Sequence, residues 1–168
     1  MRRICSRFFS ILAVALLMSH PVTAADGDLK TFGDWGYKCD KSTDGEQELC
    51  YVFQNVTKKD GGRLVLGARI AYRDGHKDPL LVTTVPLGSL LPPGAALMME
   101  GTDPVRLTYF LCSGEGCTTV ATPLPPAMIT SMKKGNQAVV RVMAPNQQAV
   151  NLPLSLKGFT KAMGHLKK

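Results

Sequence analysis

The cysteines are the residues of this sequence whose type and spacing could most directly support chemistry. The chain has 168 residues and five cysteines. Cys39 and Cys50 form one nearby pair, Cys112 and Cys117 form a second, and Cys5 stands alone near the start. Thiols can bind zinc, exchange electrons or form disulfides. Neither pair has the C-x-x-C spacing of a zinc knuckle or a redox-active dithiol, so disulfides are the favoured interpretation.

The first 25 residues have the pattern of a cleaved secretory signal. Arginines at positions 2, 3 and 7 precede an apolar run over 8–18, and small residues follow at 22–25. The run is too short to span a bilayer, which needs about 20 residues. Cleavage after Ala24 or Ala25 would remove Cys5 and leave four cysteines in an oxidising compartment. We therefore expect an exported protein, periplasmic, secreted or associated with the outer membrane, with one domain over 26–168.

Four cysteines allow three disulfide pairings, and the sequence favours the local one. Turn-forming residues lie inside each nearby pair, Asp-Gly at 44–45 and Ser-Gly-Glu-Gly at 113–116. Such residues let the chain double back until two cysteines come within bonding range. The predicted disulfides are Cys39–Cys50 and Cys112–Cys117.

Other side chains with possible chemistry have ordinary structural interpretations. His76 lies in a turn and His165 lies near terminal lysines, and neither belongs to a metal-binding spacing such as H-E-x-x-H. The methionines could bind Cu(I), but their positions fit core packing better. Acidic residues fall mostly in turns, and there is no nucleophile elbow or phosphate loop. We expect no catalytic residue, no metal site and no cofactor.

Composition favours one well-packed domain and argues against nucleic acid as a partner. Hydrophobic residues make up 45% and charged residues 20% of the chain, which excludes general disorder. Without the three arginines of the signal segment, 17 basic and 13 acidic side chains remain, a net charge of only +4. Aromatic residues make up 7%, too few to provide a platform on which nucleic-acid bases could stack.

Alternating apolar and polar residues predict a β-structure. The clearest alternation covers 63–73, where even positions are apolar and odd positions carry the arginines. Many short strands between turns indicate a sandwich or a barrel. Helix signals are few: one short helix is predicted over 127–134, and a short amphipathic helix near the C-terminus. The other predicted strands are 34–39, 49–56, 80–85, 95–100, 105–111, 117–121, 138–144 and 149–154.

Three arginines form the feature of the sequence that most strongly suggests a binding surface. Arg63, Arg69 and Arg73 lie on the polar side of the predicted strand 63–73. Such a row can be simply solvated. Alternatively, it can be a binding surface for an anionic partner, such as lipid phosphates, lipopolysaccharide or an acidic protein surface.

Four segments of the sequence, together with their order and their separations, resemble the invasion-associated locus B family of bacterial exported proteins. They cover essentially all of the chain after the signal segment. The segments are Phe32-Gly33-Asp34-Trp35 followed by Cys39, Cys50 and Gln54; the run Val85-Pro86-Leu87-Gly88-Ser89-Leu90-Leu91-Pro92-Pro93-Gly94; Phe110-Leu111-Cys112 to Gly116-Cys117; and Leu152-Pro153-Leu154-Ser155-Leu156-Lys157-Gly158-Phe159.

The resemblance implies an all-β, immunoglobulin-like antiparallel β-sandwich in the periplasm or cell envelope. It also implies an association with host-cell invasion in some pathogens, and no established catalytic residues. The shared motifs have structural interpretations: Trp35 as a core anchor, Gly158 as a point of close approach, and Phe159 as a plug at the end of the sandwich.

The favoured function is a non-enzymatic envelope protein that binds an envelope or host protein, or an anionic envelope component. An envelope hydrolase, a metal-handling protein and a chaperone for outer-membrane assembly are the alternatives.

Overall fold

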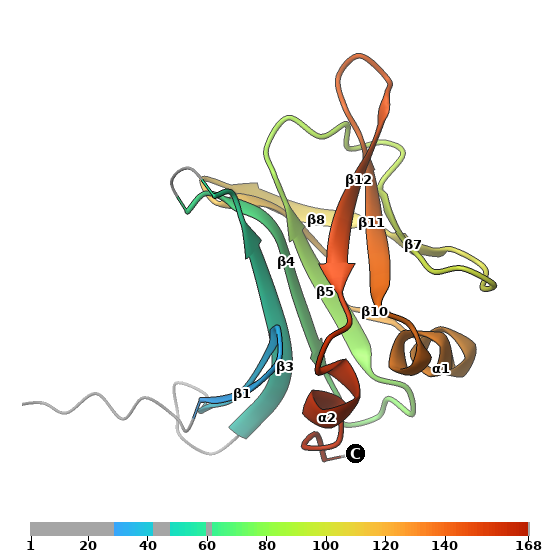
Figure 1. Ribbon diagram of the computed structural model, residues 1–168. Coiled ribbons are helices and arrows are strands. Elements are labelled where there is room, and N and C mark those ends of the chain that lie inside the picture. Colours follow the sequence, from blue (N-terminus) through green and yellow to red (C-terminus); the bar gives the residue numbers. More distant parts are fainter. Residues whose placement is uncertain (1–28, 42–47, 60–61, 168) are drawn as a thin grey trace, which may run out of the picture.

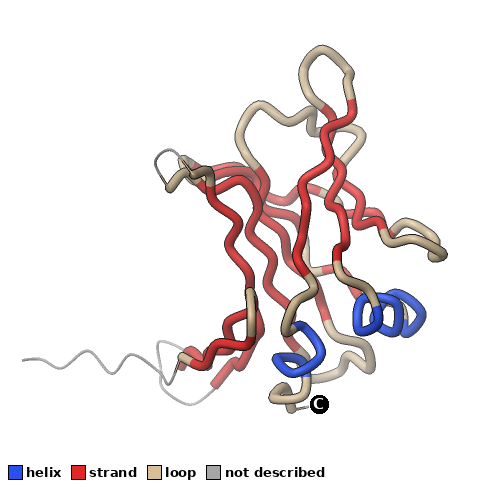
Figure 2. The backbone as a smooth tube through the Cα atoms, in the orientation of Figure 1, coloured by secondary structure: helices blue, strands red, loops and turns tan. Residues whose placement is uncertain are grey.

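The computed structural model of the protein describes residues 29–41, 48–59 and 62–167, which form two antiparallel β-sheets (Figures 1 and 2). The predicted signal segment at 1–25 and the predicted turn at 44–45 lie outside the described residues. The larger sheet has eight strands, seven in the order β1-β2-β3-β4-β5-β9-β8, with β10 paired to β5. Its strands are β1 (Lys30–Phe32), β2 (Trp35–Lys41), β3 (Glu48–Thr57), β4 (Leu64–Ala71), β5 (Leu80–Val85), β8 (Tyr109–Ser113), β9 (Gly116–Thr119) and β10 (Thr122–Pro123).

The smaller sheet has four strands in the order β12-β11-β6-β7 and faces the larger one. The predicted short helix and C-terminal helix are both present, and Figure 1 shows them at the lower end of the molecule. Together the two layers confirm the predicted antiparallel β-sandwich. The elements are β6 (Ala95–Met98), β7 (Val105–Leu107), α1 (Pro126–Lys134), β11 (Gln137–Met143), β12 (Ala149–Ser155) and α2 (Phe159–Met163).

Strand β4 shows why these residues form a sandwich. Its even-numbered residues Leu66, Ala68 and Ile70 are fully buried between the sheets, whereas Arg69 is exposed on the opposite, outer face. A strand points successive side chains to opposite faces, so an alternating sequence buries one face only. Apolar residues of β11 that face the same core, such as Val140, complete the interior.

The single strand predicted over 105–111 is wrong, because the chain divides at Thr108 into β7 and β8, which belong to different sheets. Val105 and Leu107 are buried in the core, but Leu111, at the same alternation, is 59% exposed. Alternation identified the extended backbone correctly. It could not show that the chain crosses from one layer to the other.

Both helices close the sandwich with apolar side chains. Helix α1 begins just after Pro125, as the proline pair predicts, and buries Met128 and Met132. Helix α2 is only five residues long and buries Phe159 and Met163. Among the described residues, no helix combines the length and the apolar character needed to cross a bilayer.

Candidate functional site

Residues of the first and last resembling segments meet at one junction between the two sheets, which we call the Ser155 junction (Asp34, Trp35, Gln54 and Ser155). The Trp35 indole nitrogen donates to the Ser155 carbonyl oxygen at 2.8 Å. Gln54 also donates to that oxygen, at 3.0 Å, and its own carbonyl oxygen accepts from the Ser155 amide at 2.9 Å. The Ser155 hydroxyl donates to the Asp34 carboxylate at 2.6 Å. These bonds tie β2 and β3 to β12 and satisfy the buried Trp35 and Gln54 side chains.

The last motif segment packs against the first through a glycine. Gly158 has a φ of +88°, and a Cβ there would overlap the carbonyl oxygen of Phe32. The fully buried Phe159 follows, with its ring centroid 5.0 Å from that of Trp35. The positions of Trp35, Gly158 and Phe159 therefore agree with their expected roles as core anchor, point of close approach and plug at the end of the sandwich. The motif residues that meet here serve packing.

Both predicted disulfides are present, and each joins directly opposite residues of neighbouring strands. Cys39–Cys50 links β2 to β3, and Cys112–Cys117 links β8 to β9. The first lies near the end of the long β2–β3 pair. The second closes the turn that carries Glu115. Each disulfide therefore fixes a hairpin of the larger sheet.

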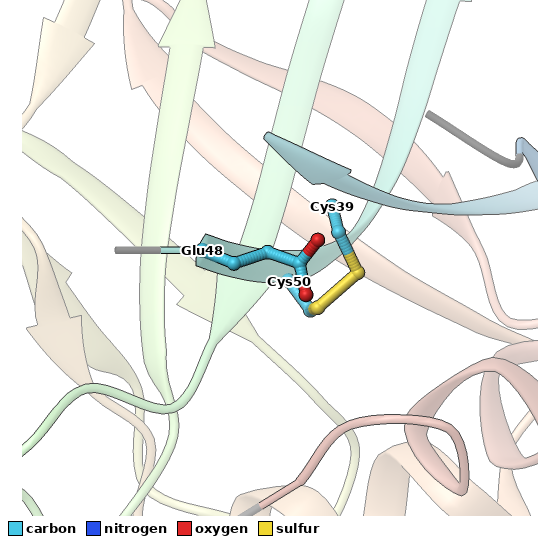
Figure 3. Close-up of side chains that lie close together, drawn as sticks. All are labelled: Cys39, Glu48 and Cys50. Atoms are coloured by element: carbon cyan, nitrogen blue, oxygen red, sulfur yellow. A yellow bond between two sulfur atoms is a disulfide. The ribbon is translucent and has the colours of Figure 1, made fainter. Parts of the chain in front are cut away.

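One group of side chains in the described part of the chain has potential metal ligands close together. Potential ligand atoms of Cys39, Glu48 and Cys50 lie within 4.8 Å of one another, and Figure 3 shows the Glu48 carboxylate beside the disulfide. The sulfur ligand of metal ions is the thiolate, which a disulfide does not provide. The Tyr37 hydroxyl also donates to the Cys39 sulfur at 3.1 Å. In this oxidised state the cluster is a structural cross-link.

The three candidate arginines do not form a single row. Only Arg69 lies within β4, because Arg63 precedes the strand and Arg73 follows it. Arg63 and Arg69 line one hollow of about 410 Å³. Arg73 lines a separate hollow of about 790 Å³, which it shares with several acidic side chains, including Asp74. The predicted surface for an anionic partner would therefore rest on Arg63 and Arg69, which share a hollow that Arg73 does not line.

A smaller hollow adjoins these two arginines on the outer face of the larger sheet. It has a volume of about 130 Å³ and is centred on strands β3, β4, β5 and β9, with the β8–β9 turn forming one wall. We call it the Gly67 hollow. Its lining includes Asn55, Gly67, Arg69, Thr84, Glu115 and Thr118.

A polar cluster beside the Gly67 hollow holds Arg69 in place. The Arg69 guanidinium lies over the ring of Tyr51, 5.9 Å from its centroid. The Tyr51 hydroxyl donates to the Asp40 carboxylate at 2.7 Å, and Lys38 pairs with the same carboxylate at 3.1 Å. The hydrogen bond from Tyr51, followed by that from Lys38, lowers the pKa of Asp40 below its ordinary value. The pKa of Tyr51 is raised, first by burial and then by the hydrogen bond to Asp40.

The histidines and methionines that were considered as possible ligands lie in turns, against aromatic rings or in the core. His76 is exposed in its turn, as expected, and also lines the hollow near Arg73. The exposed His165 stacks on Phe32, with ring centroids 4.5 Å apart. Met128, Met132 and Met163 are buried core residues, in agreement with the packing interpretation.

The sequence interpretation missed the Gly67 hollow. Asn55, Thr84 and Thr118 carry no motif and come from three different strands. The available signal was a glycine within an otherwise regular alternation, because a glycine inside a strand often marks a bulge or a close approach.

Comparison with known proteins gives a family and a fold. The family model described as "Invasion associated locus B (IalB) protein" matches residues 35–167. The crystal structure of invasion associated protein B from Bartonella henselae superposes with a TM-score of 0.72 at 19% sequence identity, covering 82% of this chain and 93% of that one. At this identity the likeness establishes the fold. No protein with a curated description matches the sequence. Since the family match extends over most of the sequence, this chain belongs to the invasion associated locus B family.

Proposed function

We propose that the protein is an exported, non-enzymatic accessory protein of the cell envelope that binds an anionic partner through the outer face of its larger sheet. One observation carries this proposal: Arg63 and Arg69 border a common hollow on that face. Neither side chain forms an ion pair with another described residue. Two guanidinium groups in this position can donate hydrogen bonds to phosphate or carboxylate oxygens.

Export is supported by the sequence and by the sulfur chemistry. The first 25 residues have the signal pattern, and the four cysteines that follow are all in disulfides. Disulfides persist in oxidising compartments such as the periplasm. The family is named for invasion, so we extend the proposal to a role in invasion where the source bacterium enters host cells.

Charge substitutions test the binding surface. The double variant Arg63→Ser/Arg69→Ser should bind isolated envelope fractions at least tenfold more weakly than the unaltered protein at low salt. Arg73→Ser/Arg106→Ser is the matched control, because it removes the same two positive charges from outside the proposed surface. Arg73 lies at a hollow that also holds acidic groups, and Arg106 is exposed on β7 of the smaller sheet. Equal binding by the double variant and the unaltered protein would refute the proposed surface. Because exposed charges are screened by salt, the difference should shrink as ionic strength rises.

Three further measurements separate this proposal from its alternatives. Metal analysis of the purified oxidised protein should find no stoichiometric copper or zinc, and a screen against envelope polymers should detect no hydrolysis. A stoichiometric metal would favour the metal-handling alternative, and hydrolysis would favour the enzyme. Loss of specific outer-membrane proteins on gene deletion would instead favour the chaperone.

A further inference from the structure

Gly67 lies in the middle of β4, where neither backbone conformation nor crowding requires a glycine. Its φ lies outside the left-handed region, and a Cβ there would lie 3.5 Å from both Asn55 Oδ1 and Thr84 Cβ, which is ordinary van der Waals contact. A glycine inside a strand weakens that strand and often marks a place where another molecule approaches the backbone. The missing side chain leaves the Gly67 hollow open.

The hollow is lined by groups that can both donate and accept hydrogen bonds. Thr84 and Thr118, on neighbouring strands, both line it, and their hydroxyl oxygens lie 3.1 Å apart. Asn55, directly opposite Gly67 on β3, adds an amide. Hydroxyl and amide groups in a concave surface suit a ligand that itself carries several hydroxyl groups.

The charges around the hollow favour a ligand with one anionic group. Arg69 lies at the Gly67 hollow and Arg63 at the adjoining one, while Glu115 lines both. Two guanidinium groups against one carboxylate leave an excess of positive charge. Asp40 does not cancel it, because the negative charge of Asp40 is offset by the positive charge of Lys38, with which it is paired. Tyr51 in turn holds the Arg69 guanidinium in position.

We propose that the Gly67 hollow, together with the larger adjoining hollow that shares Asn55, Arg69 and Glu115 with it, binds a sugar that carries a phosphate or carboxylate group. Arg69, assisted by Arg63, binds the anionic group. Asn55, Thr84 and Thr118 bind ring hydroxyls. This inference rests on the proposed function and names the ligand class for the same face of the molecule.

Filling the hollow without changing any charge tests the inference. Binding of glucose 6-phosphate and of glucuronate to the purified, oxidised protein after signal removal would be followed by ¹⁵N NMR. The expected result is saturable shifts at the amides of Asn55, Gly67, Thr84 and Thr118 with one or both probes. Gly67→Val should weaken that binding at least tenfold. Gly67→Ala, which adds one methyl group to a strand, should weaken binding less and should not lower the melting temperature.

Ala71→Val is the matched control, because Ala71 lies on the same face of β4 but outside the lining of the hollow. It should bind the probes as the unaltered protein does. Unaltered binding by Gly67→Val would overturn the proposed site, as would the absence of binding by both sugars. Equally strong binding of glucose would overturn the role of the anionic group. Equally strong binding of inorganic phosphate would overturn the role of the sugar.

The two proposals can fail separately. If Arg63→Ser/Arg69→Ser abolishes envelope binding while Gly67→Val binds the sugars as the unaltered protein does, the arginine surface stands and the sugar site is wrong. If envelope binding survives the arginine substitutions, the proposed function is wrong, whatever the sugar titrations show.

Discussion

At the scale of single residues, Gln54 shows how a polar side chain can hold two sheets in register. Its amide exchanges a donor and an acceptor bond with the backbone of Ser155, which is the arrangement that two neighbouring antiparallel strands use. Gln54 is 5% exposed, so both of its polar atoms need partners. Apolar packing alone would tolerate small shifts between the layers, whereas these two bonds fix one position.

Replacing Gln54 with leucine should lower the free energy of unfolding by about 1–3 kcal/mol. The Ser155 amide would lose its acceptor in a place that is only partly open to water. Urea unfolding followed by the fluorescence of Trp35 measures the change. Gln137→Leu, on the exposed side of β11, is the control and should change stability by less than about 0.5 kcal/mol. Equal losses in the two variants would contradict this account.

Gly158→Ala should destabilise the protein by at least about 2 kcal/mol. The new Cβ would meet the Phe32 carbonyl oxygen, in addition to the cost of a left-handed backbone for alanine. Gly75→Ala separates the two causes, because Gly75 has a φ of +80° but no atom within 4 Å of the position that its new methyl group would take. This control should cost only about 1 kcal/mol in urea unfolding. A similar loss at both positions would show that contact with Phe32 contributes nothing.

The lowered pKa of Asp40 determines the direction in which this residue's contribution to the stability of the folded protein changes with pH. Its pKa is lowered in the folded protein, mainly by the hydrogen bond from Tyr51. A lowered pKa adds stability above the ordinary carboxyl pKa of about 4, and this stability is lost as the pH falls through the folded value. Tyr51→Phe should therefore raise the pKa of Asp40, as measured by carboxyl ¹³C NMR titration. Tyr72→Phe should leave it unchanged, and an unchanged pKa in Tyr51→Phe would disprove the assignment.

At the scale of elements, local patterns predicted most strands and both helices. Alternation placed β4 and β11, and the proline pair before α1 marked its start. The division of residues 105–111 at Thr108 was not predictable in this way. The periodicity of a strand reports which side chains face inward. It does not report which sheet the strand joins, since that depends on pairing partners elsewhere in the chain.

The two disulfide-closed hairpins should differ in their contribution to stability. The cysteines are 11 residues apart in the first pair and 5 in the second. Because a longer closed loop restricts the unfolded chain more, Cys39→Ala/Cys50→Ala should cost about 3 kcal/mol and Cys112→Ala/Cys117→Ala about 2 kcal/mol. Urea unfolding of oxidised samples gives both values. In reductant the unaltered protein should lose a corresponding part of its stability. A reduced protein as stable as the oxidised one would rule out this contribution.

At the scale of the whole molecule, the candidate site depends on how distant strands are arranged. The alternation of the sequence correctly predicted that Arg69 faces outward. The predicted row of three arginines, however, required one uninterrupted strand over 63–73. Arg73 lies beyond β4, in a hollow that it shares with its neighbour Asp74 and with acidic residues of β2 and β3. The Gly67 hollow likewise combines side chains from β3, β4, β5 and β9 with the β8–β9 turn. Such a site arises from the order of strands in the sheet, which single-strand patterns do not encode.

The compartment in which the chain folds should decide whether the molecule reaches its oxidised state, with both disulfides formed. Produced with residues 1–25, the protein should appear in the periplasmic fraction with its N-terminus at Ala25 or Asp26, and without cysteines that react with maleimide. Produced from residue 26 in a reducing cytoplasm, the same chain should label at all four remaining cysteines on denaturation, because the thiols stay reduced there. The cytoplasmic product should also unfold at lower urea concentration, since both hairpins lack their cross-links. N-terminal sequencing and mass spectrometry of labelled protein measure both outcomes. An uncleaved periplasmic protein would disprove the signal assignment, whereas a cleaved protein with reactive thiols would disprove the oxidised state and leave export intact.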